Sequence, residues 1–274
     1  GWTTPKTTPF PKAPKLKITA GKPASVRSMK PMLRTVYREH LQAFNEDVLE
    51  MCDSVREVME HATAALLEQS LEDAEAALTA TDGLNEISQR CEERSMSLLA
   101  LHSPVAYDLR QVVSAIYIVE SFERMGSLAK NIALLARLRH PDPVYPEPLH
   151  GYVQELARLV YEMGAATRKL LVEPDADSAV ELHTIDEGVD DMKAYLSALV
   201  TDKDWQYTNR EAVDVSMLAR YYERYADRCV SVGRRMVFLI TGLKPEAYVQ
   251  QRDEVDYDPV KKFATIERKF RKRK

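Results

Sequence analysis

Two pairs of acidic residues stand four positions apart in the second half of the chain. Asp186 and Asp190 form one pair, and Glu223 and Asp227 form the other. On an α-helix, residues i and i+4 lie one turn apart on the same face, so each pair points its carboxylates in one direction. Like charges at this spacing repel each other unless a cation offsets them. If the two helices are neighbours, the four carboxylates make an oxygen-rich site suited to Fe, Zn, Mn or Mg ions.

The same spacing also arises on acidic helix faces that bind nothing. The chain has 42 Asp and Glu residues, so pairs at this spacing are frequent by chance. Arg220 and Arg224 flank Glu223 and are available as ion-pair partners. Spacing alone therefore leaves two interpretations open, a metal site and a solvated face held by ion pairs.

The rest of the sequence shows no recognisable catalytic apparatus. A di-iron oxidase of the ferritin type needs Glu-x-x-His, and the one such spacing, Glu147 to His150, contains Pro148. The six histidines form no H-x-x-x-H pair, and phosphate-loop, dinucleotide-binding and nucleophile-elbow motifs are missing. We predict that the chain is not an enzyme and uses no organic cofactor. The alternative is a helical metal-dependent enzyme that uses the carboxylate cluster of the second half.

Charge is unevenly distributed along the chain. Residues 1–31 carry seven Lys or Arg and no acid, and residues 261–274 carry eight bases and one acid. Each end is therefore +7, and because the whole chain is −4, the body between the ends is −18. An acidic body repels a phosphate backbone, so we expect no nucleic acid as a partner. The basic C-terminal tail could instead give peripheral contact with an anionic membrane.

The cysteines and the hydropathy pattern indicate a compartment. Cys52, Cys91 and Cys229 are far apart and odd in number, so no disulfide framework is predicted, and unpaired thiols suit a reducing environment. No run approaches the 18 or more apolar residues of a membrane-spanning helix. The N-terminus lacks the continuous apolar stretch of a signal peptide. We therefore expect a cytoplasmic protein.

Long stretches without helix breakers must position these side chains. From residue 33 onward, apolar residues recur every three or four positions, which is the period of one helix face. Further helices are predicted at about 71–101 and 104–138 and, after a break with four prolines, at about 149–172, 177–200 and 209–240. No stretch shows a convincing β alternation.

The two halves of this helical map repeat each other. Glu123-Arg124 and Glu223-Arg224 are 100 positions apart, and so are Arg110 and Arg210. Self-similarity with the same helix order indicates an internal duplication. The sequence therefore predicts an all-α fold of two tandem three-helix bundles.

Four segments follow from the map. Residues 1–31 are rich in Pro, Lys and Thr and lack a periodic apolar face, so we predict a disordered leader. Residues 32–141 and 146–243 are predicted to form the first and the second three-helix repeat. Residues 244–274 are predicted to form a flexible basic C-terminal tail.

Both repeats carry a recognisable signature. The first reads Glu92-Glu-Arg-Ser-Met-Ser-Leu-Leu-Ala-Leu-His-Ser-Pro-Val-Ala-Tyr-Asp-Leu-Arg110, followed by Glu123-Arg-Met-Gly. The second reads Ala219-Arg-Tyr-Tyr-Glu-Arg-Tyr-Ala-Asp227. In this order the motifs resemble those of the PhoU family, the phosphate-specific transport accessory proteins, and the resemblance covers about residues 32–243.

The resemblance implies a role in phosphate homeostasis. PhoU-like proteins restrain the phosphate-starvation response, the Pho regulon, when phosphate is plentiful. They are thought to do so by contact, between the ATPase subunit of the phosphate ABC importer and a membrane sensor histidine kinase. The resemblance also implies two three-helix bundles, a homodimer and multinuclear metal sites built on a Glu/Asp-x-x-x-Asp motif in each repeat.

The second repeat keeps the metal motif of the family twice, as Asp186 to Asp190 and as Glu223 to Asp227. The resemblance therefore implies that these four residues are the metal ligands of the chain.

The first repeat departs from the motif. Glu123 is present, but Ser127 stands where the family pattern has Asp. On the preceding helix the matching register gives Asn85, with Asp82 nearby, and Glu120 could partly compensate for the lost charge. We therefore predict that the first repeat binds metal weakly or not at all.

Overall fold

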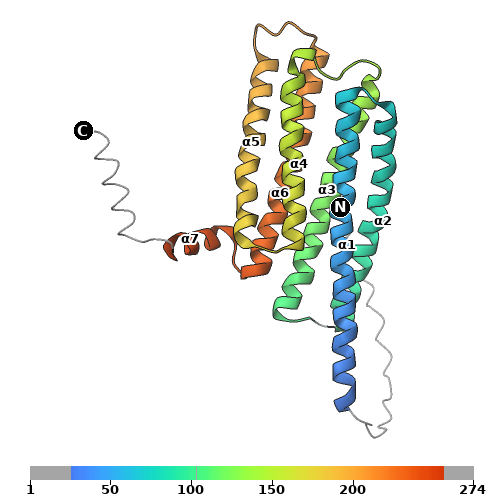
Figure 1. The fold of residues 1–274 in the computed structure, drawn as a ribbon, viewed down its shortest axis with the longest axis vertical. Helices are drawn as coiled ribbons and strands as arrows, with labels where there is room; N and C mark the ends of the chain where they lie inside the picture. The colour runs from blue at the N-terminus through green and yellow to red at the C-terminus, as the bar shows by residue number, and fades with distance from the viewer. Residues whose placement is uncertain (1–25, 103, 256–274) are drawn as a thin grey trace, which may run out of the picture. The chain divides into compact units, whose positions relative to one another are not determined.

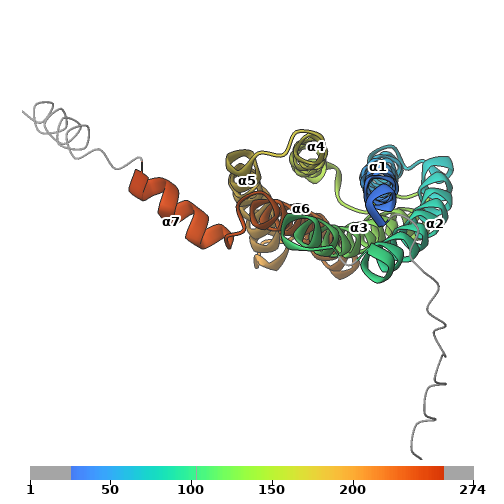
Figure 2. The same ribbon diagram turned by 90° about the horizontal axis from the view of Figure 1, so that it is seen from below.

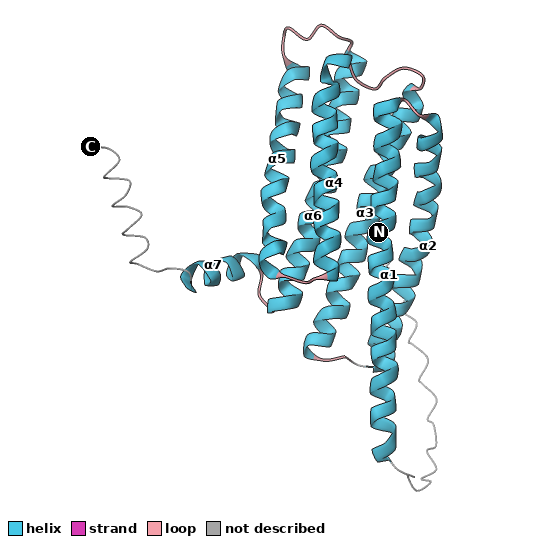
Figure 3. Cartoon of the chain, viewed as in Figure 1, coloured by secondary structure: helices cyan, strands magenta, loops and turns pink. Residues whose placement is uncertain are grey.

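A computed structural model of the chain describes residues 26–102 and 104–255. These residues form seven α-helices and one short 3-10 helix and contain no strand, which confirms the all-α prediction (Figures 1 and 3). In chain order the elements are α1 (Val26–Glu68), α2 (Leu71–His102), α3 (Ala106–Arg139), η1 (Glu147–Leu149), α4 (His150–Val172), α5 (Ala176–Thr201), α6 (Asn209–Thr241) and α7 (Pro245–Val255).

The chain divides into two compact units, one ending at Val36 and the other beginning at Tyr37. In the first unit, residues 26–36 are helical and belong to α1. The helix therefore begins inside the segment that the sequence predicted as a leader, while residues 1–25 lie outside the described residues. All further description concerns the second unit.

The helix α7 stands where the sequence predicted a flexible tail. Its first residue is Pro245, a position at which the missing N–H is no loss because the first N–H groups of a helix have no partner within it. The hydroxyl of Tyr248 donates to Oδ1 of Asp177 at 2.9 Å, and Nη1 of Arg252 lies 3.3 Å from the same oxygen. These contacts tie α7 to the N-terminal end of α5. The remainder of the predicted tail, residues 256–274, lies outside the described residues.

Local sequence sets the ends of the two helices that carry the acidic pairs. Asp175 caps α5 by accepting a hydrogen bond from the backbone N–H of Ser178 at 2.7 Å. Thr208 and Glu211 form a reciprocal capping box at the start of α6. The other end of α6 is closed by Gly242, whose φ of 75° lies in the left-handed region that glycine adopts without strain.

Four helices form a layer, and two more cover one face of it (Figure 2). At the centre α3 packs against α6, while α2 flanks α3 and α5 flanks α6. The helix α4 packs on α5 and α6. From Tyr37 on, α1 lies on the same side as α4, where Thr63 and Tyr222 of α6 share a buried hydrogen bond of 2.7 Å. The opposite face of α3 and α6 has no covering helix among the described residues.

The two repeats match position by position. The buried positions of α1 and α4 are 105 residues apart, and those of α3 and α6 are 100 apart. Matching pairs of buried residues are Phe44 and Leu149, Val48 and Val153, Met51 and Leu156, Ile118 and Leu218, and Phe122 and Tyr222. On α2 and α5, Leu84 and Val189 match at a separation of 105. This register allows each residue of one repeat to be compared with its equivalent in the other.

None of the described helices is both long enough and apolar enough to cross a membrane. The buried apolar residues of these helices form one continuous core shared by both repeats.

Candidate functional site: a carboxylate cluster on α5 and α6

The four carboxylates predicted as ligands lie on two helices that pack against each other. Asp186 falls in the buried stripe of α5, between Leu182 and Val189, and only 5% of its surface is exposed. Glu223 is likewise buried on α6, at 8% exposure. Asp190 is exposed and Asp227 is half-buried. The helix pairing thus brings the predicted residues into one region of the second repeat.

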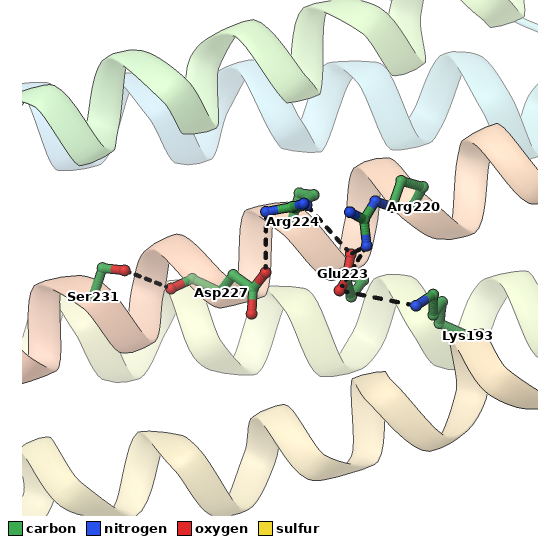
Figure 4. A network of polar contacts seen from close by, with 6 residues as sticks. All are labelled: Lys193, Arg220, Glu223, Arg224, Asp227 and Ser231. Atoms are coloured by element: carbon green, nitrogen blue, oxygen red, sulfur yellow. Dashed lines mark hydrogen bonds and ion pairs between the residues drawn. The ribbon is translucent and has the colours of Figure 1, made fainter.

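Glu223 is held by cations (Figure 4). Nη1 of Arg220 donates to both carboxylate oxygens of Glu223, at 3.1 and 3.0 Å. Nζ of Lys193 on α5 lies 4.0 Å from Oε1, and Nε of Arg224 lies 3.9 Å from Oε2. A buried carboxylate is tolerated when it is paired and hydrogen-bonded in this way.

Asp227 is held more loosely. Its Oδ2 lies 4.0 Å from Nη1 of Arg224, and both side chains are more than 40% exposed. Its backbone carbonyl accepts a hydrogen bond from the hydroxyl of Ser231 at 2.9 Å (Figure 4). An exposed ion pair at this distance contributes little to stability, so the carboxylate of Asp227 remains available to another cation.

Asp186 is the residue whose environment is least satisfied. Its Oδ1 is buried and has no hydrogen-bond partner among the described residues. Burial, with smaller contributions from the nearby carboxylates of Asp190 and Asp227, raises the pKa of Asp186 from 3.8 to about 6. A carboxyl group in this position keeps its proton up to a mildly acidic pH, and above that pH its buried charge calls for a cation beside it.

In the orientations that the structure shows, the side chains of the cluster do not form a metal site. Among the described residues, no three His, Cys, Asp or Glu side chains converge closely enough to hold a metal ion. The oxygen donors are of the kind that hard cations prefer. Glu223, however, is turned to Arg220, so both of its oxygens are already in use. Metal binding by these residues therefore stays a prediction, and we derive no chemical step from it.

The contacts of the two Glu residues confirm the register between the repeats. Ser88 of α2 donates to Glu123 of α3 just as Lys193 of α5 approaches Glu223 of α6. Ser88 and Lys193 are 105 positions apart, and Glu123 and Glu223 are 100 positions apart. The equivalents of the second-repeat carboxylates can therefore be assigned from structure.

Three of these four equivalents are neutral. Asp186 corresponds to Thr81, Asp190 to Asn85 and Asp227 to Ser127, while Glu223 corresponds to Glu123.

The hydroxyl groups of Thr81 and Ser127 donate hydrogen bonds to backbone oxygens of their own helices. Thr81 is buried, and its hydroxyl donates to the backbone oxygen of Ala77 at 2.8 Å. The hydroxyl of Ser127 donates to the backbone oxygen of Glu123 at 3.0 Å. Asp82, the residue singled out from the sequence, is exposed one position away from the matching place. The first repeat therefore lacks one more carboxylate than the sequence comparison indicated.

Glu120 and Glu123 border a separate hollow in the first repeat. A cavity of about 300 Å³ lies between α1, α2 and α3, with Phe44 and Val119 in its wall and Ser88 at its edge. Glu120 also lies 3.5 Å from Arg124, its i+4 neighbour. The residue proposed to compensate for lost charge is thus engaged with an arginine of its own helix.

Sequence inspection missed Lys193 in the second-repeat cluster and Thr81, the first-repeat equivalent of Asp186. Lys193 is separated by 30 positions from the Glu223 that it approaches, and no motif marks it. Thr81 was passed over because Asp82 is acidic and adjacent. The signal that finds both is the 105-residue offset combined with burial, because Thr81 and Asp186 are both buried.

Comparison with known proteins agrees with this architecture. The family model of the PhoU domain matches residues 48–136 and 153–236. These matches start 105 positions apart and end 100 apart, as the structural register does. The phosphate-specific transport system accessory protein PhoU homolog 1 of Mycobacterium leprae is 40% identical over 214 residues, which are 78% of this chain and 96% of the relative. The PhoU homolog 2 of Mycobacterium tuberculosis is 39% identical over 213 residues, which are 78% of this chain and 100% of the relative.

Two solved structures share the fold. PhoU from Pseudomonas aeruginosa has a TM-score of 0.68 at 23% identity and covers 76% of this chain and 100% of its own. The phosphate transport system regulatory protein PhoU from Streptococcus pneumoniae has a TM-score of 0.69 at 24% identity, with coverages of 76% and 98%. The repeat register, the domain matches and the similarity to the mycobacterial proteins lead to one conclusion: the chain belongs to the PhoU family.

Proposed function

We propose that this chain is a cytoplasmic accessory protein of phosphate-specific transport that regulates phosphate uptake and the phosphate-starvation response by contact. In this proposal it links the ATPase subunit of the phosphate ABC importer to a membrane sensor histidine kinase. It acts as a homodimer and keeps the Pho regulon repressed when phosphate is plentiful. The observation that carries the proposal is the 40% identity to a phosphate-specific transport accessory protein over 96% of that protein's length.

The geometry of the second repeat supports action by contact. Within the cluster, the charge of Glu223 is neutralised by the three cations that surround it. Arg220 and Arg224 remain almost half exposed, so their outer faces are available to acidic groups of a partner. Exposed charges of this kind set the rate and specificity of association more than its strength.

A genetic experiment tests the proposal. In a host from which the genes of its PhoU family members have been deleted, this chain should restore repression of a phosphate-responsive reporter in phosphate-rich medium. The empty vector is the control, and the chain should leave induction by phosphate starvation intact. If the reporter stays fully active in phosphate-rich medium although the chain is present and folded, the proposed regulatory role is wrong.

The second candidate is the helical metal-dependent enzyme built on Asp186, Asp190, Glu223 and Asp227. The observation in its favour is the carboxyl group of Asp186, which has a pKa of about 6 and an unpartnered oxygen. This enzyme would lose turnover in Asp227→Asn while the variant keeps its helical content. The regulatory proposal instead predicts altered partner binding in the same variant.

A further inference from the structure

The cavity of about 300 Å³ in the first repeat has both acidic and apolar side chains in its wall. Glu92 of α2 and Glu120 and Glu123 of α3 line it, and none of the described residues that line it is basic. Phe44 and Val119, which also line it, are buried. Small-molecule sites commonly combine apolar walls with a few polar groups in this way.

The three carboxylates of this cavity are largely free to bind a cation. Ser88 donates to Oε1 of Glu123, but Oε2 has no partner among the described residues. In the same part of the chain, the carboxylate of Glu92 has neither a hydrogen bond nor an ion pair. Glu120 lies 3.5 Å from Arg124, and both side chains are about half exposed, so water screens this pair. The cavity wall therefore offers carboxylate oxygens that the protein itself leaves unpaired.

The equivalent region of the second repeat already contains cations (Figure 4). Arg220 donates to both oxygens of Glu223, and Lys193 lies 4.0 Å from the same carboxylate. By the register between the repeats, the first-repeat equivalents of Lys193, Arg220 and Glu223 are Ser88, Glu120 and Glu123. In the second repeat a guanidinium group thus bonds the glutamate. In the first repeat the same glutamate has no guanidinium beside it and borders a cavity.

We propose that the first-repeat cavity binds a guanidinium group carried on a short aliphatic chain. This group takes the place that the guanidinium of Arg220 has in the second repeat. The carboxylate of Glu123 accepts its N–H groups, since guanidinium and carboxylate match in geometry and in charge. Glu92 and Glu120 add negative charge, and the aliphatic chain lies against the apolar part of the wall.

An organic cation suits this cavity better than a metal ion. Among the described residues, no three His, Cys, Asp or Glu side chains converge closely enough to hold a metal ion. A guanidinium group is larger and has five N–H donors, so it can bond carboxylates that are further apart. Cys91 also lines the cavity, and a buried thiol behaves as a small apolar group, which suits an aliphatic chain.

A guanidinium group on an aliphatic chain has two sources, a free small molecule and an arginine side chain of a partner protein. Two probes distinguish these sources. Butylguanidinium represents the free molecule, and N-acetylarginine N-methylamide represents an arginine within a protein. Binding of both probes supports the proposal with a partner's arginine as the ligand. Binding of butylguanidinium alone supports it with a free small molecule, because the cavity then excludes the peptide groups.

Calorimetric titration of the full, chelator-treated chain at low salt tests the proposal. We expect saturable binding of butylguanidinium, and binding of the neutral analogue butylurea that is weaker by at least about tenfold. Glu123→Gln should weaken binding of butylguanidinium by a similar factor, because it removes the charge that accepts the N–H groups. The matched control is Glu86→Gln, an exposed acid of α2 outside the cavity wall, which should leave binding unchanged.

A second variant copies the cations of the second repeat into the first. Ser88→Lys combined with Glu120→Arg should abolish binding of butylguanidinium, because the chain then supplies its own cations to Glu123. The control is Gln89→Lys combined with Glu86→Arg, which adds the same charge at exposed positions of α2 outside the cavity wall. Unchanged helical circular dichroism shows that each variant keeps its fold, and Glu123→Gln remains decisive if the double variant does not.

Four results would each overturn the proposal. The first is that neither guanidinium probe binds to the unchanged chain. The second is that butylurea binds as tightly as butylguanidinium. The third is that binding survives Glu123→Gln or the folded Ser88→Lys, Glu120→Arg variant. The fourth is an equal loss of binding in the control variants, which would show attraction to the acidic chain as a whole.

Discussion

Thr81 and Asp186 occupy equivalent buried positions on α2 and α5, but only Asp186 can carry a charge. The hydroxyl of Thr81 is satisfied by a backbone oxygen of its own helix. A carboxylate has no such option because it only accepts hydrogen bonds, and Oδ1 of Asp186 finds no donor among the described residues. The buried, unpartnered carboxyl group of Asp186 therefore destabilises the second repeat, whereas the hydrogen-bonded hydroxyl of Thr81 does not destabilise the first. A local loss of stability of this kind is typical of a functional site.

The raised pKa of Asp186 predicts a pH-dependent effect of its substitution. The folded state holds this proton up to a pH of about 6, whereas the unfolded chain releases it near 3.8. The free energy of unfolding therefore falls as the pH rises from about 4 to about 6 and is lowest above that range. Asp186→Asn should accordingly stabilise the chelator-treated protein by about 2–3 kcal/mol at pH 8 and have little effect at pH 4.

Urea denaturation at the two pH values measures this difference. The matched control is Asp191→Asn, an exposed acid on the same helix, which should change stability by less than about 0.5 kcal/mol at either pH. A stabilisation by Asp186→Asn that is equally large at pH 4 would show that its proton is not involved.

The bond between Arg220 and Glu223 predicts how metal binding responds to substitution. If a cation is to use Glu223, it must displace the guanidinium that now bonds both carboxylate oxygens. Arg220→Gln should therefore raise the affinity for Mn²⁺ or Zn²⁺, whereas Asp227→Asn should abolish binding. Isothermal titration of the metal-stripped protein measures both affinities.

The first repeat provides the control for the metal prediction. Glu123→Gln should leave the amount of bound metal unchanged, because three of the four equivalent positions in that repeat are neutral. Elemental analysis after reloading with metal gives the count. Two equally filled clusters would contradict the assignment of metal to the second repeat.

At the scale of elements, the contact between α3 and α6 is asymmetric. At one end, Arg139 bonds the buried Asp214 through both oxygens, at 2.6 and 3.0 Å. The equivalent positions at the other end hold Leu239 and Ser114, both buried, and the hydroxyl of Ser114 has no partner among the described residues. The contact between α3 and α6 thus contains an ion pair at one end and uncharged side chains at the equivalent positions of the other end.

This asymmetry predicts the outcome of a swap. Arg139→Leu leaves the carboxylate of Asp214 buried without its partner and should destabilise the fold by about 3–5 kcal/mol. The double variant Arg139→Leu, Asp214→Ser copies the other end of the interface and should recover most of the loss, because both charges are removed together. Thermal unfolding of the single and the double variants gives the comparison. A double variant as unstable as Arg139→Leu would mean that the two ends are not equivalent.

Much of this arrangement could be predicted from the sequence. The period of apolar residues and the prolines between residues 141 and 148 located all six helices of the two repeats. The helix α7 escaped prediction because it is short and polar, and its contacts with Asp177 come from a helix far away in the sequence. Of the cations around Glu223, Arg220 could be predicted because it is close in sequence, whereas Lys193 could not because it is 30 positions away.

A groove of about 290 Å³ between the repeats, with a wall formed by α1, α3, α4 and α6, could not be predicted from the sequence for a different reason. It exists because the chain passes from one repeat to the other only once, through residues 140–149, so only one of two equivalent spaces is filled by that connection. Periodicity and motifs describe what each helix buries, but they do not describe a space that no connection enters.

For the whole molecule, the charge distribution predicts contact with acidic surfaces through the C-terminal tail. Residues 261–274 carry +7 on a body of −18. Removal of these residues should weaken binding to vesicles that contain anionic lipid, and the loss should be greatest at low salt, where electrostatic attraction is least screened. Sedimentation with neutral vesicles is the control. Equal binding of the full and the shortened chain to anionic vesicles would exclude the lipid role.

Partner capture is the most direct test of the proposed regulation of phosphate transport by contact. The tagged chain is isolated from phosphate-replete and from phosphate-starved cells, and its partners are identified by mass spectrometry. We predict that the ATPase subunit of a phosphate ABC importer or a sensor histidine kinase is recovered, in amounts that depend on phosphate. Recovery of neither protein in either state would contradict the account and favour the metal-dependent enzyme.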